Sequence, residues 1–262
     1  MQQELINQGL LGDLEPISLK GLDSVKLLNR VDRKYIVSVS DLTQVFQLLI
    51  ENQYSVLEID GHRAFSYQTI YFDTTDYRFY RDHHNRLSSR IKVRTRTYKE
   101  NNLHFFEIKM KSNVRTNKLR EGLSQPGNIL SSTQRNKITS IYQKKIESAL
   151  NPALINNFTR ITLVNKHKTE RCTIDVNVAF RNPESPENEI SLPGIAIIEV
   201  KQSKTSLLNG IVVSLRAMRV SPSSISKYVL GLILIHPEIK YNSFKPLLQK
   251  INKIQKQTLS LT

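Results

Sequence analysis

Arginine and lysine recur at every second position in one short segment of the sequence. In the run RIKVRTRTY, which begins at Arg90, the cations are Arg90, Lys92, Arg94 and Arg96. Side chains two residues apart in a strand point to the same face, so all four lie opposite apolar and threonine side chains. Crowded like charges need an anion to balance them. Arginine offers a planar fork and lysine a point charge, which indicates a phosphate-binding surface.

Four other segments alternate in the same way, with charged or polar side chains facing apolar ones. These charged faces carry Arg30, Asp32 and Lys34; Glu107, Lys109 and Lys111; Arg171, Thr173, Asp175 and Asn177; and Glu199 and Lys201. Any one such strand could be the solvated face of an antiparallel sheet. Five strands of one design instead favour a barrel whose charged faces line a lumen and whose apolar faces lie outward under helices.

Acidic residues stand among these cations at Asp32, Glu107, Asp175 and Glu199. Carboxylate oxygens are suitable ligands for a Mg²⁺ or Mn²⁺ ion that also binds substrate phosphates. The alternative is that each carboxylate pairs with a neighbouring lysine or arginine. For Glu107 and Asp175 both interpretations stay open, whereas Glu199 is the better candidate for a metal ligand.

The elements that must position these residues can be predicted from periodicity. Period-2 alternation predicts strands, and amphipathic periodicity predicts helices. We expect a single α+β domain with an antiparallel sheet, because strands and helices do not alternate along the chain. The segments 121–135 and 181–194 are expected to be loops. The predicted strands are 30–38, 65–73, 88–98, 103–111, 158–165, 171–179 and 194–202, and the predicted helices are 41–51, 132–149, 205–217, 225–235 and 244–258.

Composition narrows the function classes. The 262 residues carry a net charge of +15, which is typical of proteins with polyanionic partners. The single cysteine, Cys172, excludes an intramolecular disulfide. The N-terminus does not resemble a secretory signal, and the longest apolar run, 228–235, is too short to span a membrane. We therefore expect a cytoplasmic protein. No nucleotide-binding or hydrolase motif is present, and His83 and His84 are interpreted as polar turn residues.

Several of these segments together resemble a known family. The run YQTIYFDTTDYRFYRDHHNRLSSRIKVRTRTY, then FFEIKMK, NKLR, FTRI, RCTIDVN, IIEVKQ and SKY, resembles the VTC domain. This domain is the polyphosphate polymerase module of the vacuolar transporter chaperone complex and its bacterial relatives, in the triphosphate tunnel (CYTH-like) superfamily. The resemblance extends from about Arg30 to about Leu232. The SPX domain and membrane region of the eukaryotic proteins are not recognisable here, so the resemblance does not extend to their regulation or translocation.

The resemblance implies a closed antiparallel β-barrel, or tunnel, with helices packed outside. It implies a partly helical N-terminal segment (1–29), a tunnel domain (30–236) and a basic C-terminal helix or tail (237–262). It also implies transfer of the ATP γ-phosphoryl group onto a growing polyphosphate chain, with Mn²⁺ or Mg²⁺ held by Glu199. Phosphates would be bound by Lys34, Arg94, Arg96, Lys109, Lys118, Arg160 and Lys227, with Arg90, Arg120 and Lys201 in support and Lys92 and Lys111 added from the strand faces.

Three other functions remain open from the sequence. The first is a triphosphatase of the same fold, although such enzymes begin with Glu-x-Glu-x-Lys, where this chain has Arg30-x-Asp32-x-Lys34. That difference favours the polymerase. The second is a polyphosphate-binding module without catalysis. The third is a nucleic-acid-binding domain, which is disfavoured because only Tyr98 continues the cationic face of its strand. We expect ATP and polyphosphate or triphosphate as partners, no nucleic acid, and leave a membrane-protein partner open.

Overall fold

The structure is a computed structural model, and it describes residues 11–23, 30–113, 115–203 and 210–259. The helices are α2 (Leu19–Asp23), α3 (Leu42–Glu51), α4 (Arg78–His84), α5 (Ser132–Tyr142), α6 (Ile211–Ala217), α7 (Lys227–Ile235) and α8 (Lys245–Leu259). The strands are β1 (Glu15–Ile17), β2 (Arg30–Ser38), β3 (Tyr54–Leu57), β4 (Ala64–Thr74), β5 (Ser89–Tyr98), β6 (Leu103–Ser112), β7 (Arg115–Leu123), β8 (Leu150–Asn165), β9 (Glu170–Asn182), β10 (Ser185–Leu192) and β11 (Ile195–Ser203).

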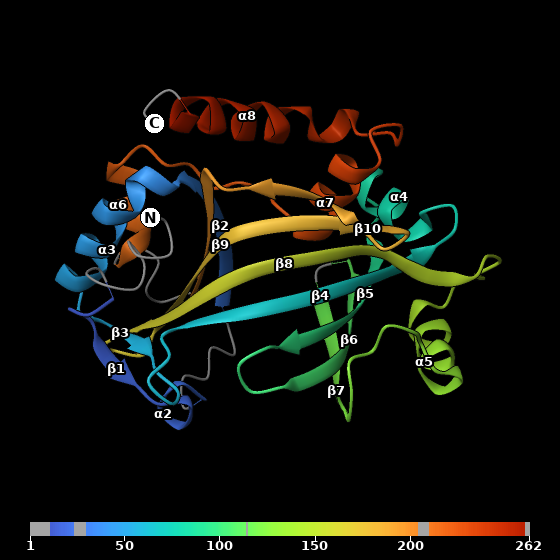
Figure 1. Cartoon of the computed structure of the whole chain (residues 1–262), viewed down its shortest axis with the longest axis horizontal. Coiled ribbons are helices and arrows are strands. Elements are labelled where there is room, and N and C mark those ends of the chain that lie inside the picture. Colours follow the sequence, from blue (N-terminus) through green and yellow to red (C-terminus); the bar gives the residue numbers. More distant parts are fainter. Residues whose placement is uncertain (1–10, 24–29, 114, 204–209, 260–262) are drawn as a thin grey trace.

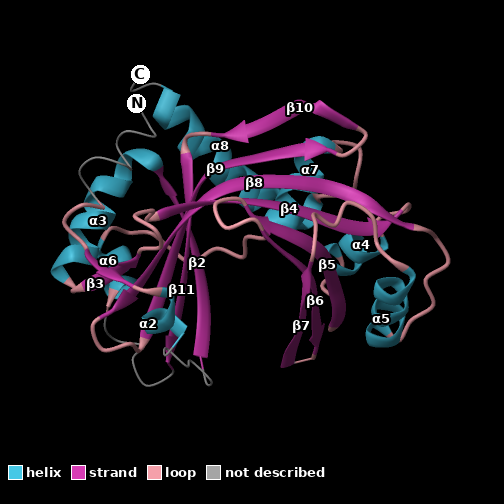
Figure 2. Ribbon diagram, turned by 60° about the horizontal axis from the view of Figure 1, so that its bottom comes forward, coloured by secondary structure: helices cyan, strands magenta, loops and turns pink. Residues whose placement is uncertain are grey.

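One sheet organises the molecule. Its main path runs β2-β11-β9-β8-β4-β5-β6-β7, and every neighbouring pair on this path is antiparallel. The sheet curls strongly, so that β2 and β11 stand across from β5, β6 and β7 (Figures 1 and 2). The predicted α+β fold, an antiparallel sheet with helices packed outside it, is confirmed, although over the described residues the sheet is not the closed barrel that the resemblance implied. The two end strands of this path, β2 and β7, do not pair with each other in the described residues. The sheet is therefore a half-barrel.

Two apolar clusters cover the outer face of this sheet. One joins α3 and α6 to β2, β9 and β11, with Phe46, Ile174 and Ile198 fully buried. The other joins α5 to β4, β5 and β6 through Phe72, Val93 and other residues. The apolar half of each alternating strand is therefore what anchors the sheet beneath its helices.

A third apolar cluster lies on the inner face, at one end of the sheet. Helix α7 packs here against β8 and β9, and α8 lies over β2 and β11 (Figure 1). Gly231 allows the close approach of α7, because a Cβ atom there would lie 2.5 Å from the Phe180 ring and 2.6 Å from Leu154. Helices thus cover both the outer face and one end of the inner face.

A β-bulge changes the face that β9 presents at this end. The register between β8 and β9 shifts between Asn157 and Thr159, and Asn177 takes a left-handed φ of 52°. Beyond the bulge, Val178 and Phe180 pack in the cluster with α7. Unbroken alternation along the predicted strand 171–179 would place Val178 on the outer face with Cys172. That expectation is wrong, because a bulge inverts the alternation that follows it.

Other differences arise where tertiary contacts override local patterns. The predicted loop 181–194 is largely the β9–β10 hairpin, and β8 begins at Leu150, eight residues before the predicted start. Helix α5 ends at Tyr142, where Gln143 adopts a left-handed conformation, and not at 149. Of the predicted helix 205–217, positions 205–209 lie outside the described residues. Strand β7 and helix α4 were not predicted.

Substituting Val93 tests the outer face of β5. Val93 is 1% exposed in the cluster beneath α5, so Val93→Asp places an unpaired charge in an apolar environment. We expect the free energy of unfolding to fall by more than about 3 kcal/mol, as measured by denaturant unfolding. Lys99→Asp, at an exposed position just after the same strand, should change it by less than about 1 kcal/mol. Equal effects would mean that Val93 faces solvent.

Candidate functional site

The predicted phosphate-binding residues lie on the inner face of the sheet, here called the cationic face. Charges on opposite walls of the half-barrel lie close enough across this face for one to affect the pKa of another. The ammonium groups of Lys34 on β2 and Lys109 on β6 are close enough that, after burial, Lys34 contributes most to lowering the pKa of Lys109. The sheet curls so that strands far apart in the sequence surround one concave face (Figure 2). Lys34 and Lys109 show that cations from these strands come near one another there.

Glu107 on β6 is the centre of the first charge cluster. Its carboxylate is 2% exposed and contacts the Nε of Arg94 at 2.7 Å and the Nζ of Lys118 at 2.5 Å, with the Nε of Arg120 at 3.7 Å. Burial raises the pKa of Glu107, but Arg94, Arg96 and Lys118 outweigh burial and hold it well below its usual range. Glu107 is thus an ionised anchor that orients three cations.

Asp175 on β9 is the centre of the second cluster. The Arg160 guanidinium binds it in a two-pronged geometry, with Nε–Oδ1 and Nη2–Oδ2 distances of 2.5 and 2.7 Å. Lys227, the first residue of α7, contacts the same carboxylate. Burial opposes ionisation, yet Arg160 and Lys227 hold the pKa of Asp175 well below its usual range. Both carboxylates therefore follow the ion-pair alternative that the sequence left open.

The N-terminus of α7 links two walls of the half-barrel. The Nζ of Lys34 donates to the carbonyl oxygen of Ile225 at 3.1 Å, and the Nζ of Lys92 donates to Ser226 Oγ at 2.9 Å. Ser226 also caps α7 through the amide of Val229. Since Lys227 contacts Asp175, strands β2, β5 and β9 all meet this segment.

Arg96 is the most buried of the predicted arginines, at 8% exposure. It donates to Thr69 Oγ1 at 3.2 Å and lies over the rings of Tyr67 and Phe158. Burial and the Arg94 and Arg160 charges lower its pKa, which shows how crowded with positive charge this position is. Within the described residues Arg96 forms no ion pair, so its charge is available to an anion.

The remaining predicted cations occupy the ends of the cationic face. Lys201 lies opposite Asp32 across the β11–β2 pair, and burial lowers its pKa against the opposing effect of Glu199. Arg90 donates to the carbonyl of Leu87 and lies opposite Lys111 across the β5–β6 pair. The structure thus brings every predicted cation to this surface, but Arg90 is turned toward the backbone of its own turn.

Glu199 fits the role of a metal ligand better than the other carboxylates. It lies between Lys34 on β2 and Thr173 on β9, and in the described part of the chain it makes no hydrogen bond or ion pair. Burial raises its pKa, but Lys34, Lys201 and Arg160 lower it to about 2, so it is ionised. The neighbouring Thr173 Oγ1 is buried without a hydrogen-bond partner. An ionised carboxylate beside an unsatisfied hydroxyl can bind a hard cation.

This arrangement has too few ligands to hold a metal alone. Among the described residues, no group of three or more His, Cys, Asp or Glu side chains is placed to bind one. A Mg²⁺ or Mn²⁺ ion at Glu199 would therefore need phosphate oxygens to complete its coordination, as Mg²⁺ commonly does.

Sequence reasoning missed His83, which it treated as a turn residue. His83 lies in α4, with its ring 6.0 Å from that of Tyr228, and its Nε2 is buried without a partner. Burial, with Lys92 and Arg90 nearby, lowers the pKa of His83 to about 2, so the imidazole is neutral beside the cationic face. The position of DHHNR, three residues before RIKVRTR, was the available signal.

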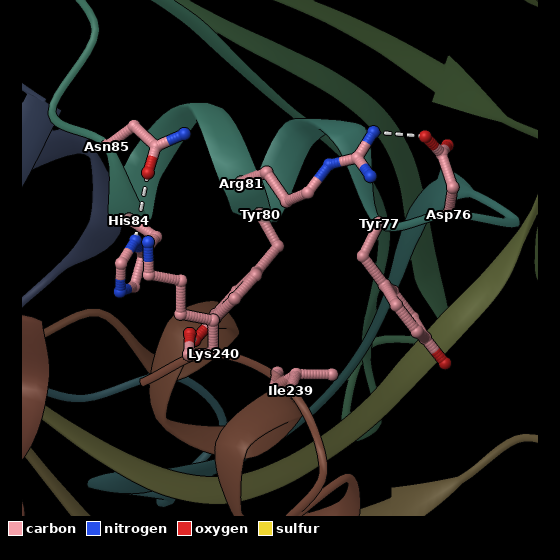
Figure 3. A pocket seen from close by; sticks show the side chains of 8 residues that line it. All are labelled: Asp76, Tyr77, Tyr80, Arg81, His84, Asn85, Ile239 and Lys240. Atoms are coloured by element: carbon pink, nitrogen blue, oxygen red, sulfur yellow. Dashed lines mark hydrogen bonds and ion pairs between the residues drawn. The ribbon is translucent and has the colours of Figure 1, made fainter. Parts of the chain in front are cut away.

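A cavity of about 370 Å³ lies between α4 and the segment after α7 (Figure 3). It holds none of the predicted phosphate-binding residues. The Tyr80 hydroxyl donates to the carbonyl of Lys240 across it, and Arg81 pairs with Asp76 at its rim. Its lining residues are Asp76, Tyr77, Tyr80, Arg81, His84, Asn85, Ile239 and Lys240.

The protein is thus a half-barrel: a curled antiparallel sheet with a concave face rich in cations and two carboxylates buried as their counter-ions. The sequence profile of the VTC domain matches residues 29–236. The chain therefore belongs to the VTC domain family. No curated protein matches its sequence. No helix in the described residues has both the length and the apolar character needed to cross a membrane.

Some solved structures are similar to this chain at low sequence identity. A candidate adenylate cyclase from Vibrio parahaemolyticus is 11% identical, covering 78% of this chain and 99% of its own, with a TM-score of 0.46. A candidate adenylyl cyclase from Hippeastrum, described as having a dominant triphosphatase activity, is 10% identical, with a TM-score of 0.48. The match covers 79% of this chain and 96% of the Hippeastrum chain. A Pyrococcus horikoshii protein is 13% identical, covering 78% and 98%, with a TM-score of 0.42.

The crowded lysines predict an unusual pH dependence of stability. Burial lowers the pKa of Lys227 to about 8 despite the opposing effect of Asp175, and the pKa values of Lys92, Lys109 and Lys201 are also lowered, chiefly by burial. Above pH 8 the unfolded chain holds a proton at Lys227 that the folded chain has lost. Lys227 should therefore contribute about 1–2 kcal/mol of added stability between pH 8 and 9.5. The Cys172 thiol reduces this gain, because burial raises its pKa and it ionises first in the unfolded chain.

Denaturant unfolding at several pH values would measure this gain. Nearer pH 10 the trend should reverse, because burial raises the pKa of tyrosines such as Tyr80 and Tyr142, which ionise more readily in the unfolded chain. Lys227→Met should reduce the gain. Stability that falls steadily from pH 8 to 9.5 would contradict the prediction.

Proposed function

We propose that this protein is a metal-dependent polyphosphate polymerase that transfers the γ-phosphoryl group of ATP onto a polyphosphate chain. The carrying observation is the cationic face, where cations from β2, β5, β6, β7, β8, β11 and α7 far outnumber the carboxylates. Glu107 and Asp175 each orient cations, while Arg96 is free of ion pairs within the described residues. Such a surface supports binding of a chain of phosphates.

Phosphoryl transfer requires that the two reacting phosphates be aligned and that their negative charge be neutralised. Phosphoryl transfer has a transition state with charge spread over the phosphoryl oxygens, which preorganised guanidinium and ammonium groups stabilise. Arg94 and Arg160 are held by buried carboxylates, so they need little reorganisation when the phosphates bind. Glu199, with Thr173 beside it, would hold Mn²⁺ or Mg²⁺, which supplies charge neutralisation between phosphate oxygens.

The state of the carboxylates supports transfer to phosphate over transfer to water. Hydrolysis requires that a water molecule be activated, and Glu107 and Asp175 are poor bases because their paired cations hold the pKa of each well below its usual range. The terminal phosphate of a polyphosphate chain is already ionised at neutral pH. It can therefore attack without a protein base.

Product analysis tests this proposal. Purified protein incubated with ATP and Mn²⁺ should form ADP and long polyphosphate, which is resolved on a gel. Release of orthophosphate without chain growth would assign a triphosphatase, and binding without turnover would assign a binding module.

Thermal unfolding provides an independent test of phosphate binding. Triphosphate should stabilise the protein well above orthophosphate, and long polyphosphate at least as much as triphosphate. A ligand that binds only the folded state at a hundredfold excess over its Kd contributes about 2.7 kcal/mol. Duplex DNA of matched phosphate concentration should give little shift, and an equal shift would favour a nucleic-acid-binding domain.

A further inference from the structure

A row of aromatic side chains crosses four strands of the cationic face, beside the turn that joins β5 to β6. Phe158 on β8 stacks on Tyr67 on β4 with ring centroids 5.0 Å apart. Tyr67 lies 4.7 Å from Tyr98 on β5, which meets Phe105 on β6 edge-on at 5.5 Å. Of these four rings, only Tyr98 can be assigned to the cationic face from the sequence alone. The other three come from strands whose alignment the sequence does not reveal.

Arginines from the cationic face border this row. The Arg120 guanidinium lies 3.7 Å from the ring centroid of Phe105 and donates to the Tyr98 hydroxyl at 2.7 Å. Arg96 and Arg160 lie over the Tyr67 ring at 5.5 and 5.4 Å. The aromatic row is therefore continuous with the phosphate-binding surface.

The two ends of the row differ in exposure. Tyr67 and Phe158 are buried, and core packing accounts for them. Tyr98 and Phe105 are only half-buried, and 39% of the Arg120 side chain is exposed. Two partly exposed rings beside an arginine plane form a surface on which a planar ring can stack, because aromatic rings and guanidinium groups both stack on nucleobases. A polyphosphate chain has no ring and makes no use of such a surface.

We propose that Tyr98, Phe105 and Arg120 form the site for the nucleobase of the nucleoside triphosphate donor. This proposal rests on the proposed function and adds the part of the substrate that the cations do not recognise. Arg96 and Arg94 precede Tyr98 on β5 by two and four residues, so they lie about 7 and 13 Å from it along the strand. A base stacked at Tyr98 therefore directs its phosphates along Arg96 and then Arg94.

Stacking without edge recognition also predicts weak base selectivity. Every base has a π-face, so the site should accept any nucleoside triphosphate, with purines bound more tightly than pyrimidines because they stack over a larger area. Inorganic triphosphate should bind through the cations alone.

The test compares ligands with and without a base in matched variants. The Kd values of ATP, UTP and inorganic triphosphate are measured by calorimetry for the wild-type protein and for Tyr98→Leu, Phe105→Leu and Tyr98→Phe. We expect the leucine variants to weaken ATP binding about 5- to 100-fold and to change triphosphate binding less than twofold. Tyr98→Phe, which keeps the ring, should retain ATP affinity.

Tyr77→Leu is the matched control, because Tyr77 is a half-buried tyrosine beside α4 and lines the separate cavity (Figure 3). It should leave the affinities for all three ligands unchanged. Equal weakening of ATP and triphosphate in the leucine variants would overturn the proposal and make the row structural. Tighter binding of a ten-nucleotide single strand than of ATP, lost in Tyr98→Leu, would overturn it in favour of nucleic acid. If the wild-type protein binds none of the three ligands, the proposed function fails first.

Discussion

Replacing Arg96 by alanine is expected to lower phosphoryl transfer at least about a hundredfold while the protein remains folded. Arg96 is nearly buried among Arg94, Arg160 and two aromatic rings, and its pKa is lowered by burial and by these cations. Its positive charge is therefore costly in the empty protein and becomes favourable only when an anion is bound. Losing it removes transition-state stabilisation and relieves repulsion in the ligand-free state.

Steady-state turnover with ATP, together with thermal unfolding of the ligand-free variant, would measure both effects. Arg96→Ala should unfold at or slightly above the wild-type temperature. Arg94→Ala is a less specific test, because it removes a partner of the buried Glu107 carboxylate and should lower stability as well. Arg81→Ala, an exposed arginine in the rim of the separate cavity, is the control and should keep full turnover. Normal turnover in Arg96→Ala would remove the cationic face from the mechanism.

Replacing Glu199 by glutamine is expected to reduce metal-dependent turnover at least about a hundredfold, while phosphate binding is retained. Glu199 is an ionised carboxylate with a pKa of about 2 and no ion-pair partner in the described residues. Glutamine keeps its size but loses the charge that attracts a divalent ion. Without metal, the affinity for triphosphate should be unchanged or higher, because one negative charge has left a surface that binds anions.

Turnover measured at increasing Mn²⁺ concentration reports the loss of metal dependence. Calorimetry with triphosphate in the absence of metal reports whether phosphate binding survives. Glu189→Gln, on the exposed strand β10, is the matched control and should behave as the wild type. A Glu199→Gln enzyme with the wild-type metal dependence would show that the ion binds at a different carboxylate.

The residue pattern by itself determined which side chains share a face. Period-2 alternation is a property of the strand backbone, so Arg94 and Arg96 could be placed opposite Val93 without knowledge of any neighbour. The amphipathic 3.6-residue periodicity, which is also local, predicted helices 41–51 and 225–235, and the structure contains them almost unchanged as α3 and α7. The antiparallel sheet could be predicted because strands and helices do not alternate along the chain.

Only the tertiary structure decided which charges meet. Arg160, Asp175 and Lys227 come from β8, β9 and α7, and their contacts depend on strand register and on the docking of a helix. Neither the strand register nor the docking of the helix can be read from a short stretch of sequence. The bulge at Asn177 reverses the face of Val178 for the same reason, since it exists only relative to the partner strand. Alternation therefore determines the composition of a surface. Pairing between distant segments decides which of its carboxylates form ion pairs and which, like Glu199 in the described residues, do not.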